Sequence, residues 1–226
     1  MNIKDRAKKV VSVKEFKNAG KTLNVKEIDL ETPSDEQYIL RMVVSVNGQD
    51  FYIPKELDWI KPLFNEALKH QREVIQVTHS FCYITIRNGL VKSKTDEEWH
   101  VDGFSTKITH IPEQNYTWCN KIGTEYSDLN VEFPEDFDSN KFNVNLFLEK
   151  YINKNNIHKC QEKTLYCFDP YIVHRRPIKS ENTIRTFVRI SFVPIEINDI
   201  NNTQNKLLQR LYTEDGVAKR NTLIKY

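Results

Sequence analysis

Short apolar and β-branched segments recur along the chain at intervals of roughly 8–12 residues, with turn residues between them. This pattern predicts many short strands and favours an antiparallel sandwich or jelly roll over a fold of alternating strands and helices. Two Asn-Gly pairs, at 47–48 and 88–89, carry the signal of tight turns between strands. We expect strands within residues 37–54, 74–91, 97–104, 108–111, 115–119, 164–168, 171–173 and 183–195.

Few segments show helical spacing. Between Glu56 and Gln71, apolar residues recur at i, i+3, i+4 and i+7, which predicts an amphipathic helix. We expect a second helix over residues 141–153 and a short terminal helix after Thr203. The fold class predicted from the pattern is therefore mainly β, with a few helices flanking one domain over residues 1–226.

Candidate metal ligands lie on one of the expected strands. His100 and Asp102 are two residues apart, so they project to the same face with Cα atoms about 6.6 Å apart. This spacing alone is weak, because six histidines and 31 acidic residues give about one His-x-Asp/Glu by chance. His174 follows on a distant strand, and two imidazoles with one carboxylate form the facial triad of non-haem Fe(II) oxygenases.

Two arginines complete the ordered set. Residues 185, 187, 189 and 191 share one face of a predicted strand, so Arg185, Arg189 and Ser191 are expected to point into one cavity. A buried guanidinium without an anionic partner is costly, whereas a bidentate contact with a carboxylate satisfies it. The pattern therefore favours a site for an acidic ligand beside the metal.

Residues 97–195 resemble the Fe(II)/2-oxoglutarate-dependent dioxygenases through the segments WHVDGF, VHRRP and RTFVRISF. The resemblance implies a double-stranded β-helix (jelly roll) with flanking α-helices. Residues 1–96 would support this core and residues 196–226 would form a tail. It also implies Fe(II) on His100, Asp102 and His174, with 2-oxoglutarate as cosubstrate and ascorbate as a reductant. The implied reaction is hydroxylation with release of succinate and CO2.

The resemblance leaves the cosubstrate clamp open between two residues. The run RTFVRIS is similar to the taurine-dioxygenase branch, in which the first arginine, here Arg185, holds 2-oxoglutarate. Arg-Ile-Ser at 189–191 is similar to the Arg-x-Ser motif of the penicillin-synthase branch, which assigns the clamp to Arg189 with Ser191. Thr117 is expected to lend a hydroxyl to the cosubstrate. The retained Asp102 argues against the halogenase variant of the family.

The substrate is not identified by these motifs. We expect a small molecule, an amino acid or a peptide, with Trp99, Phe104 and Tyr116 as candidate substrate contacts. One alternative is a cupin-like module that binds a metal without oxygenase activity. Another is a zinc-dependent hydrolase using the same three ligands, which would leave Arg185 and Arg189 without a role.

Composition adds limits rather than a function. The 226 residues are 39% apolar and carry a net charge of +2, which excludes extensive disorder. No apolar run reaches the ~20 residues of a membrane span, and the first residues carry no apolar signal segment. The four cysteines form no CxxC pair, so we expect reduced thiols and a cytoplasmic location. The basic segment up to Lys21 is a candidate nucleic-acid contact.

Overall fold

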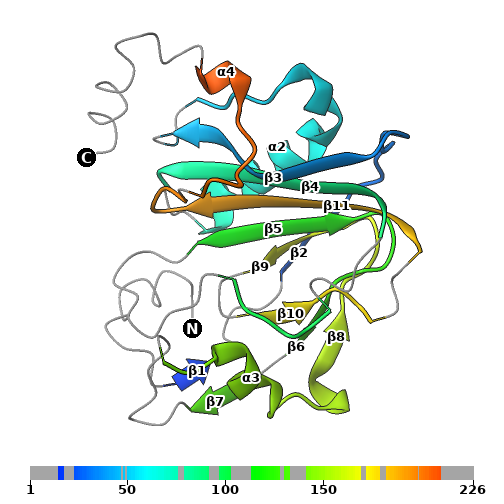
Figure 1. Ribbon diagram of the computed structural model, residues 1–226, viewed down its shortest axis with the longest axis vertical. Helices are drawn as coiled ribbons and strands as arrows, with labels where there is room; N and C mark the ends of the chain where they lie inside the picture. The colour runs from blue at the N-terminus through cyan, green and yellow to red at the C-terminus, as the bar shows by residue number, and fades with distance from the viewer. Residues whose placement is uncertain are drawn as a thin grey trace.

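The computed structural model describes antiparallel sheets of six, three and two strands with few helices (Figure 1). The expectation of a mainly β chain is therefore confirmed. The residues it describes are 15–17, 23–46, 48, 50–75, 79–91, 97–102, 113–127, 130–132, 141–168, 172–178, 182–197 and 199–209.

The larger sheet has six strands and holds the hydrophobic core against one of its faces. Its central strands, β11 and β4, pair over ten residues each, so they form a long, regular platform. In spatial order the strands are β2 (Leu23–Glu27), β9 (Thr164–Phe168), β5 (Gln114–Cys119), β11 (Ile184–Val193), β4 (Phe81–Leu90) and β3 (Gln37–Val46).

The smaller sheet has three short strands, in the order β10 (Val173–Arg175), β6 (Glu125–Ser127) and β8 (Ile157–Lys159). An isolated antiparallel bridge between His100 and His174 extends this sheet by one residue pair beyond β10. A separate two-stranded ribbon pairs β1 (Glu15–Lys17) with β7 (Asn130–Glu132). The bridge is what joins the expected metal-ligand segment to the second sheet.

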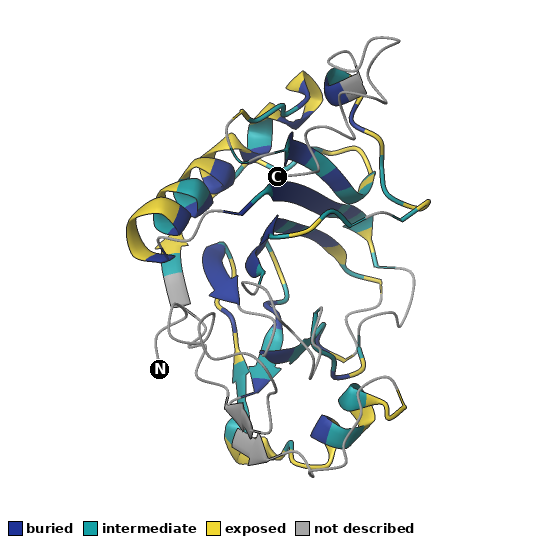
Figure 2. Cartoon of the chain, turned by 90° about the vertical axis from the view of Figure 1, so that its left-hand side faces the viewer, coloured by how far each residue is buried: buried dark blue, intermediate teal, exposed yellow. Residues whose placement is uncertain are grey.

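The helical segments are short, and the longest covers one face of the larger sheet (Figure 2). Leu63, Phe64 and Ala67 form the buried side of α2 (Lys61–His70), and Pro62 lies in its first turn, where the missing N–H costs no hydrogen bond. The others are η1 (Lys55–Ile60), the π-helical turn η2 (Gln71–Ile75), α3 (Val144–Glu149), η3 (Lys154–Asn156) and α4 (Lys206–Gln209). None of the helices in these described ranges is long and apolar enough to cross a membrane.

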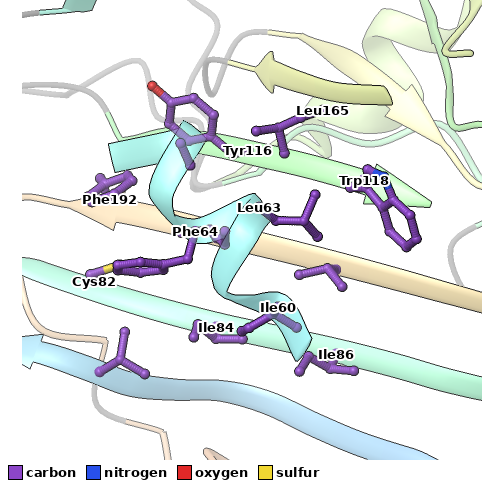
Figure 3. Packing of buried hydrophobic residues seen from close by; sticks show 14 of the residues in the cluster. Ile60, Leu63, Phe64, Cys82, Ile84, Ile86, Tyr116, Trp118, Leu165 and Phe192 are labelled. Atoms are coloured by element: carbon purple, nitrogen blue, oxygen red, sulfur yellow. The ribbon is translucent and has the colours of Figure 1, made fainter. Parts of the chain in front are cut away.

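Alternation along the strands separates the core from the polar side of the sheet. Even-numbered residues of β4, β5 and β11 pack under α2, as Figure 3 shows for Ile84, Trp118 and Phe192. Odd-numbered residues of the same strands, such as Arg189, project to the opposite face. The functional residues therefore stand on a rigid sheet whose other side is a packed core.

Some elements differ from the sequence-based expectation. The expected hairpin at Asn47 and Gly48 is incomplete: Gly48 has a positive φ of 67°, but the chain then enters η1, and β3 pairs with β4 instead. The pair Asn88-Gly89 lies inside β4 rather than ending a hairpin, because β4 remains paired with β11 through Leu90. Residues 108–111 lie outside the described residues.

Candidate metal centre and its arginine-lined cavity

His100 and His174 are held side by side by their own backbones. The backbone N–H of His100 donates to the carbonyl of His174 at 3.0 Å, and the reverse bond is 2.9 Å long. The two ring centroids lie 4.5 Å apart. Because main-chain bonds fix the pair, the positions of both rings follow from the fold.

Both imidazoles are oriented in the same way. Nδ1 of His100 lies 2.8 Å from the carbonyl oxygen of Glu98, and Nδ1 of His174 lies 2.8 Å from that of Ile172. A carbonyl oxygen only accepts, so each Nδ1 is the donor in its contact. This backbone contact is the usual outer support of a metal-binding histidine.

Asp102 completes a group of three ligand atoms. One atom from each of His100, Asp102 and His174 lies within 4.8 Å of the others, and Oδ2 of Asp102 is 3.4 Å from Nε2 of His174. Burial alone would raise the pKa of Asp102, but the Arg189 charge and the hydrogen bond with His174 outweigh it and hold that pKa well below its usual range. Two imidazole nitrogens and one carboxylate oxygen form a donor set that suits a first-row divalent metal.

Arg189 is committed to this carboxylate. Its Nη1 lies 2.6 Å from Oδ2 of Asp102. Arg189 is placed for this contact by β11, where it pairs with Thr117 of β5 and Thr85 of β4. A charge-assisted bond of this length fixes the carboxylate that would face the metal.

Arg185 has no such partner. Only 8% of the residue is exposed, and its Nε donates to the carbonyls of Lys121 and Ile122 at 3.2 and 3.1 Å. Its guanidinium carbon lies 5.1 Å from the ring centroid of Phe187. Burial lowers the pKa of Arg185, and no acidic side chain pairs with it among the residues that the structure describes. A buried guanidinium with neutral partners calls for an external anion.

These groups line one cavity of about 170 Å³ between the sheets. Besides Arg189, two of its arginines have carboxylate neighbours: Arg175 donates to Glu125 at 2.7 Å, and Arg176 lies 3.5 Å from Glu97. The remaining lining combines the three candidate ligands with hydroxyls, one phenyl ring and three further arginines: Thr85, Thr117, Thr124, Phe187, Arg87, Arg185 and Arg189.

The other sequence-predicted site residues divide between the cavity and its surroundings. Thr117 lines the cavity, opposite Arg189. Ser191 shares the cavity face but lies outside its lining, and its hydroxyl donates to Oδ1 of Asn115 at 2.5 Å. Ser191 thus links strands β11 and β5 through its hydroxyl and does not line the cavity.

The structure describes two of the three expected substrate contacts, Trp99 and Tyr116. Trp99 is buried outside the cavity lining, with the Arg175 guanidinium 4.2 Å from its ring centroid. Tyr116 points to the opposite face of β5, where its hydroxyl donates to Gln71 (Figure 3). Neither residue lines this cavity, and their role as substrate contacts stays a prediction. Phe104 lies outside the described residues.

Sequence reasoning missed residues that the fold brings to the site. Arg87 occupies an odd-numbered position of β4 and could have been found from the alternation Thr85, Arg87, Gly89. Arg176 directly follows the candidate ligand strand. Burial, and then the charge of Asp102, raise the pKa of Glu113.

Comparisons with known proteins identify no family. No family model matches the chain, and no curated protein does. The solved structure of AviO1 from Streptomyces viridochromogenes Tue57 is 13% identical and aligns over 89% of this chain and 84% of its own, with a TM-score of 0.40. That of EvdMO1 is 14% identical over 77% of this chain and 39% of its own, with a TM-score of 0.38.

Proposed function

We propose that the protein is an Fe(II)/2-oxoglutarate-dependent oxygenase that oxidises a small-molecule, amino-acid or peptide substrate. The observation that carries the proposal is the group formed by His100, Asp102 and His174, in which one possible ligand atom from each residue lies within 4.8 Å of the others. A set of two imidazoles and one carboxylate that leaves open positions is characteristic of non-haem iron oxygenases.

The order of the strands supports a jelly-roll core for this proposal. From β4 onward the chain alternates between the sheets: β4 is in the larger sheet, His100 bridges the smaller one, and β5 returns to the larger. β6 and β8 lie in the smaller sheet, β9 in the larger, β10 in the smaller and β11 in the larger. Such winding across two facing sheets is what a double-stranded β-helix requires.

The site contains residues that would bind the metal and residues that orient those ligands. His100, Asp102 and His174 would hold Fe(II), while the carbonyls behind the rings and Arg189 behind Asp102 orient the three ligands. Fe(II) bound there would supply the activation of O2 that couples decarboxylation of 2-oxoglutarate, to succinate and CO2, with substrate oxidation.

Arg185 is the residue we assign to the distal carboxylate of 2-oxoglutarate. Arg189 already neutralises Asp102, whereas Arg185 is buried in the same cavity with only neutral partners. Thr117 adds a hydroxyl on the same face. The assignment favours the first of the two arginines that the sequence left open.

Titration of the purified protein under anaerobic conditions tests this proposal. We expect Mn(II), as a stand-in for Fe(II), to bind with one site per chain, and 2-oxoglutarate to raise the melting temperature further only when the metal is present. Arg185→Gln should keep the metal but weaken 2-oxoglutarate binding about 10-fold to 100-fold, because a charge-assisted contact is lost. Arg72→Gln, at an exposed helical position, is the matched control.

Turnover provides the second readout. With Fe(II), ascorbate and 2-oxoglutarate, the wild-type protein should release succinate even without substrate, at a slow uncoupled rate, and Arg185→Gln should not. Metal binding without any effect of 2-oxoglutarate would instead identify a cupin-like metal-binding module. If no metal binds, the proposal is wrong.

A further inference from the structure

Arg185 is oriented by a strained turn. Its Nε–H is shared between the carbonyls of Lys121 and Ile122, at 3.2 and 3.1 Å. These two residues belong to the turn that follows β5, and Ile122 has a positive φ of 54°. A β-branched residue is rare in this left-handed region, and its backbone stays there only when the surroundings hold it. The turn that positions the proposed cosubstrate arginine therefore requires support from other parts of the chain.

Main-chain bonds fix the two ends of this turn. The carbonyl of Cys119 accepts the N–H of Lys163 at 2.7 Å, and the carbonyl of Thr124 accepts the N–H of Cys160 at 2.9 Å. Both bonds lie outside the strained residue. They therefore do not by themselves fix the conformation of Ile122.

Glu162 supplies a contact at the strained residue itself. It lies between β8 and β9, and its Oε1 accepts the N–H of Ile122 at 2.8 Å. A hydrogen bond to a charged acceptor is about twice as strong as a bond between neutral groups. Its contribution is of the same order as the cost of placing a non-glycine residue in the left-handed region. Loss of this carboxylate would therefore allow the turn to relax.

We propose that Glu162 is a positioning residue for 2-oxoglutarate, because it holds Ile122 in the conformation in which the turn carbonyls accept from Arg185. The inference rests on the proposed function, since it requires that Arg185 contact the cosubstrate. Fixing Nε fixes the plane of the guanidinium, and a bidentate contact with a carboxylate requires that plane. Glu162 is exposed and does not line the cavity of the candidate metal centre, so it acts on the cosubstrate only through the turn.

Calorimetric titration of the Mn(II)-loaded protein with 2-oxoglutarate, under anaerobic conditions, tests the inference. Glu162→Ala should weaken cosubstrate binding about fivefold to tenfold and leave the Mn(II) affinity unchanged. Glu162→Gln keeps an oxygen acceptor and should stay within about threefold of the wild-type affinity. Glu56→Ala, which removes the same side chain from an exposed position of η1, is the matched control. In succinate release, Glu162→Ala should raise the KM for 2-oxoglutarate and not lower kcat.

A second substitution separates positioning from general destabilisation. Asparagine adopts the left-handed region more readily than isoleucine, so adding Ile122→Asn to Glu162→Ala should restore cosubstrate affinity. Melting temperatures show whether each variant is folded. Equal losses in Glu162→Ala and Glu162→Gln, an equal loss in Glu56→Ala, or no rescue by Ile122→Asn would overturn the inference.

The same titrations distinguish this inference from the proposed function. If the wild-type protein binds no 2-oxoglutarate, the proposed function is wrong and the role of Glu162 is wrong with it. If the wild-type protein binds 2-oxoglutarate and Glu162→Ala binds it equally well, only the role of Glu162 is wrong.

Discussion

His100 and His174 are bonded to each other through their main chains, each donating its N–H to the carbonyl of the other at 3.0 and 2.9 Å. The side chains take no part in this bridge. Each ring is instead held by a carbonyl two residues earlier in its own segment. The backbone bonds between the two segments build the site, so the bridge does not depend on either imidazole.

Removing either imidazole should therefore abolish metal binding without unfolding the protein. We expect His174→Ala to weaken Mn(II) binding by more than about 100-fold, because loss of a ligand exceeds the 10-fold to 100-fold cost of losing an outer-shell contact. The metal-free melting temperature should fall by only a few degrees. His158→Ala is the control. His158 lies in β8, stacks on Tyr126 of β6 and lies outside the cavity lining.

Calorimetry and thermal melting together decide this prediction. Equal metal affinities of His174→Ala and the wild-type protein would show that the three-residue group is not the metal site. An unfolded His174→Ala would show that the ring, and not the bridge, supports the local structure.

Arg189 and the metal should oppose each other at Asp102. The guanidinium lies 2.6 Å from Oδ2, so it neutralises the carboxylate and repels a cation placed beside it. We expect Arg189→Gln to tighten Mn(II) binding by up to about tenfold. The same change should destabilise the metal-free protein by about 1–2 kcal/mol, because the partly buried carboxylate loses its partner.

Urea unfolding without metal and Mn(II) titration measure the two effects. The opposite signs are the informative feature. Weaker metal binding in Arg189→Gln would mean that orientation of Asp102 by Arg189 matters more than charge repulsion.

The sequence predicted the ligand face but not the partners within it. Alternation along β11 placed Arg185, Arg189 and Ser191 on one face, and the register of the strand confirms it. Which arginine meets Asp102 depends on how the segment at 97–102 crosses from the larger sheet to the smaller one. That crossing is a tertiary feature, and strand periodicity carries no information about it.

Strand β5 shows why the sequence does not assign Tyr116 and Thr117 to the core face and the cavity face. All six of its residues are buried, because one face packs under α2 and the other faces the second sheet. A strand buried on both faces has no polar-apolar alternation to tell them apart. The expected helix at residues 56–71 is helical in the structure. It is made of three segments, η1, α2 and the first residue of η2.

Tyr116 and its neighbour Thr117 should give opposite phenotypes. The Tyr116 hydroxyl lies 2.9 Å from Nδ1 of His70 and 3.1 Å from the Gln71 oxygen, to which it donates. Tyr116→Phe removes the hydroxyl that contacts both groups and should cost about 1–3 kcal/mol of unfolding free energy. Ligand binding should not change, because the hydroxyl lies on the core side of β5.

Thr117→Val is the matched comparison on the cavity side. It keeps the shape of the side chain and removes the hydroxyl that lines the cavity. We expect 2-oxoglutarate binding to the metal-loaded protein to weaken about fivefold to tenfold, by the loss of one hydrogen bond. Urea unfolding of both variants, with calorimetry, completes the comparison; weaker cosubstrate binding in Tyr116→Phe would contradict the assignment of faces.

Gly123 should be intolerant of any side chain. A Cβ at this position would lie 1.8 Å from the carbonyl oxygen of Cys160, and backbone cannot yield as a flexible side chain can. The neighbouring residue Thr124 accepts the N–H of Cys160 at 2.9 Å, so relieving the clash also breaks this bond. We expect Gly123→Ala to destabilise the protein by about 2–4 kcal/mol.

Gly123→Ala should also weaken ligand binding in the cavity. Gly123 directly follows Lys121 and Ile122, whose carbonyls accept from Nε of Arg185, so displacing the turn moves the supports of that guanidinium. At temperatures where the variant is still folded, 2-oxoglutarate should bind more weakly while Mn(II) affinity is retained. Urea unfolding and sequential titration of metal and cosubstrate measure both effects, and an unchanged unfolding midpoint would show that the turn relaxes without cost.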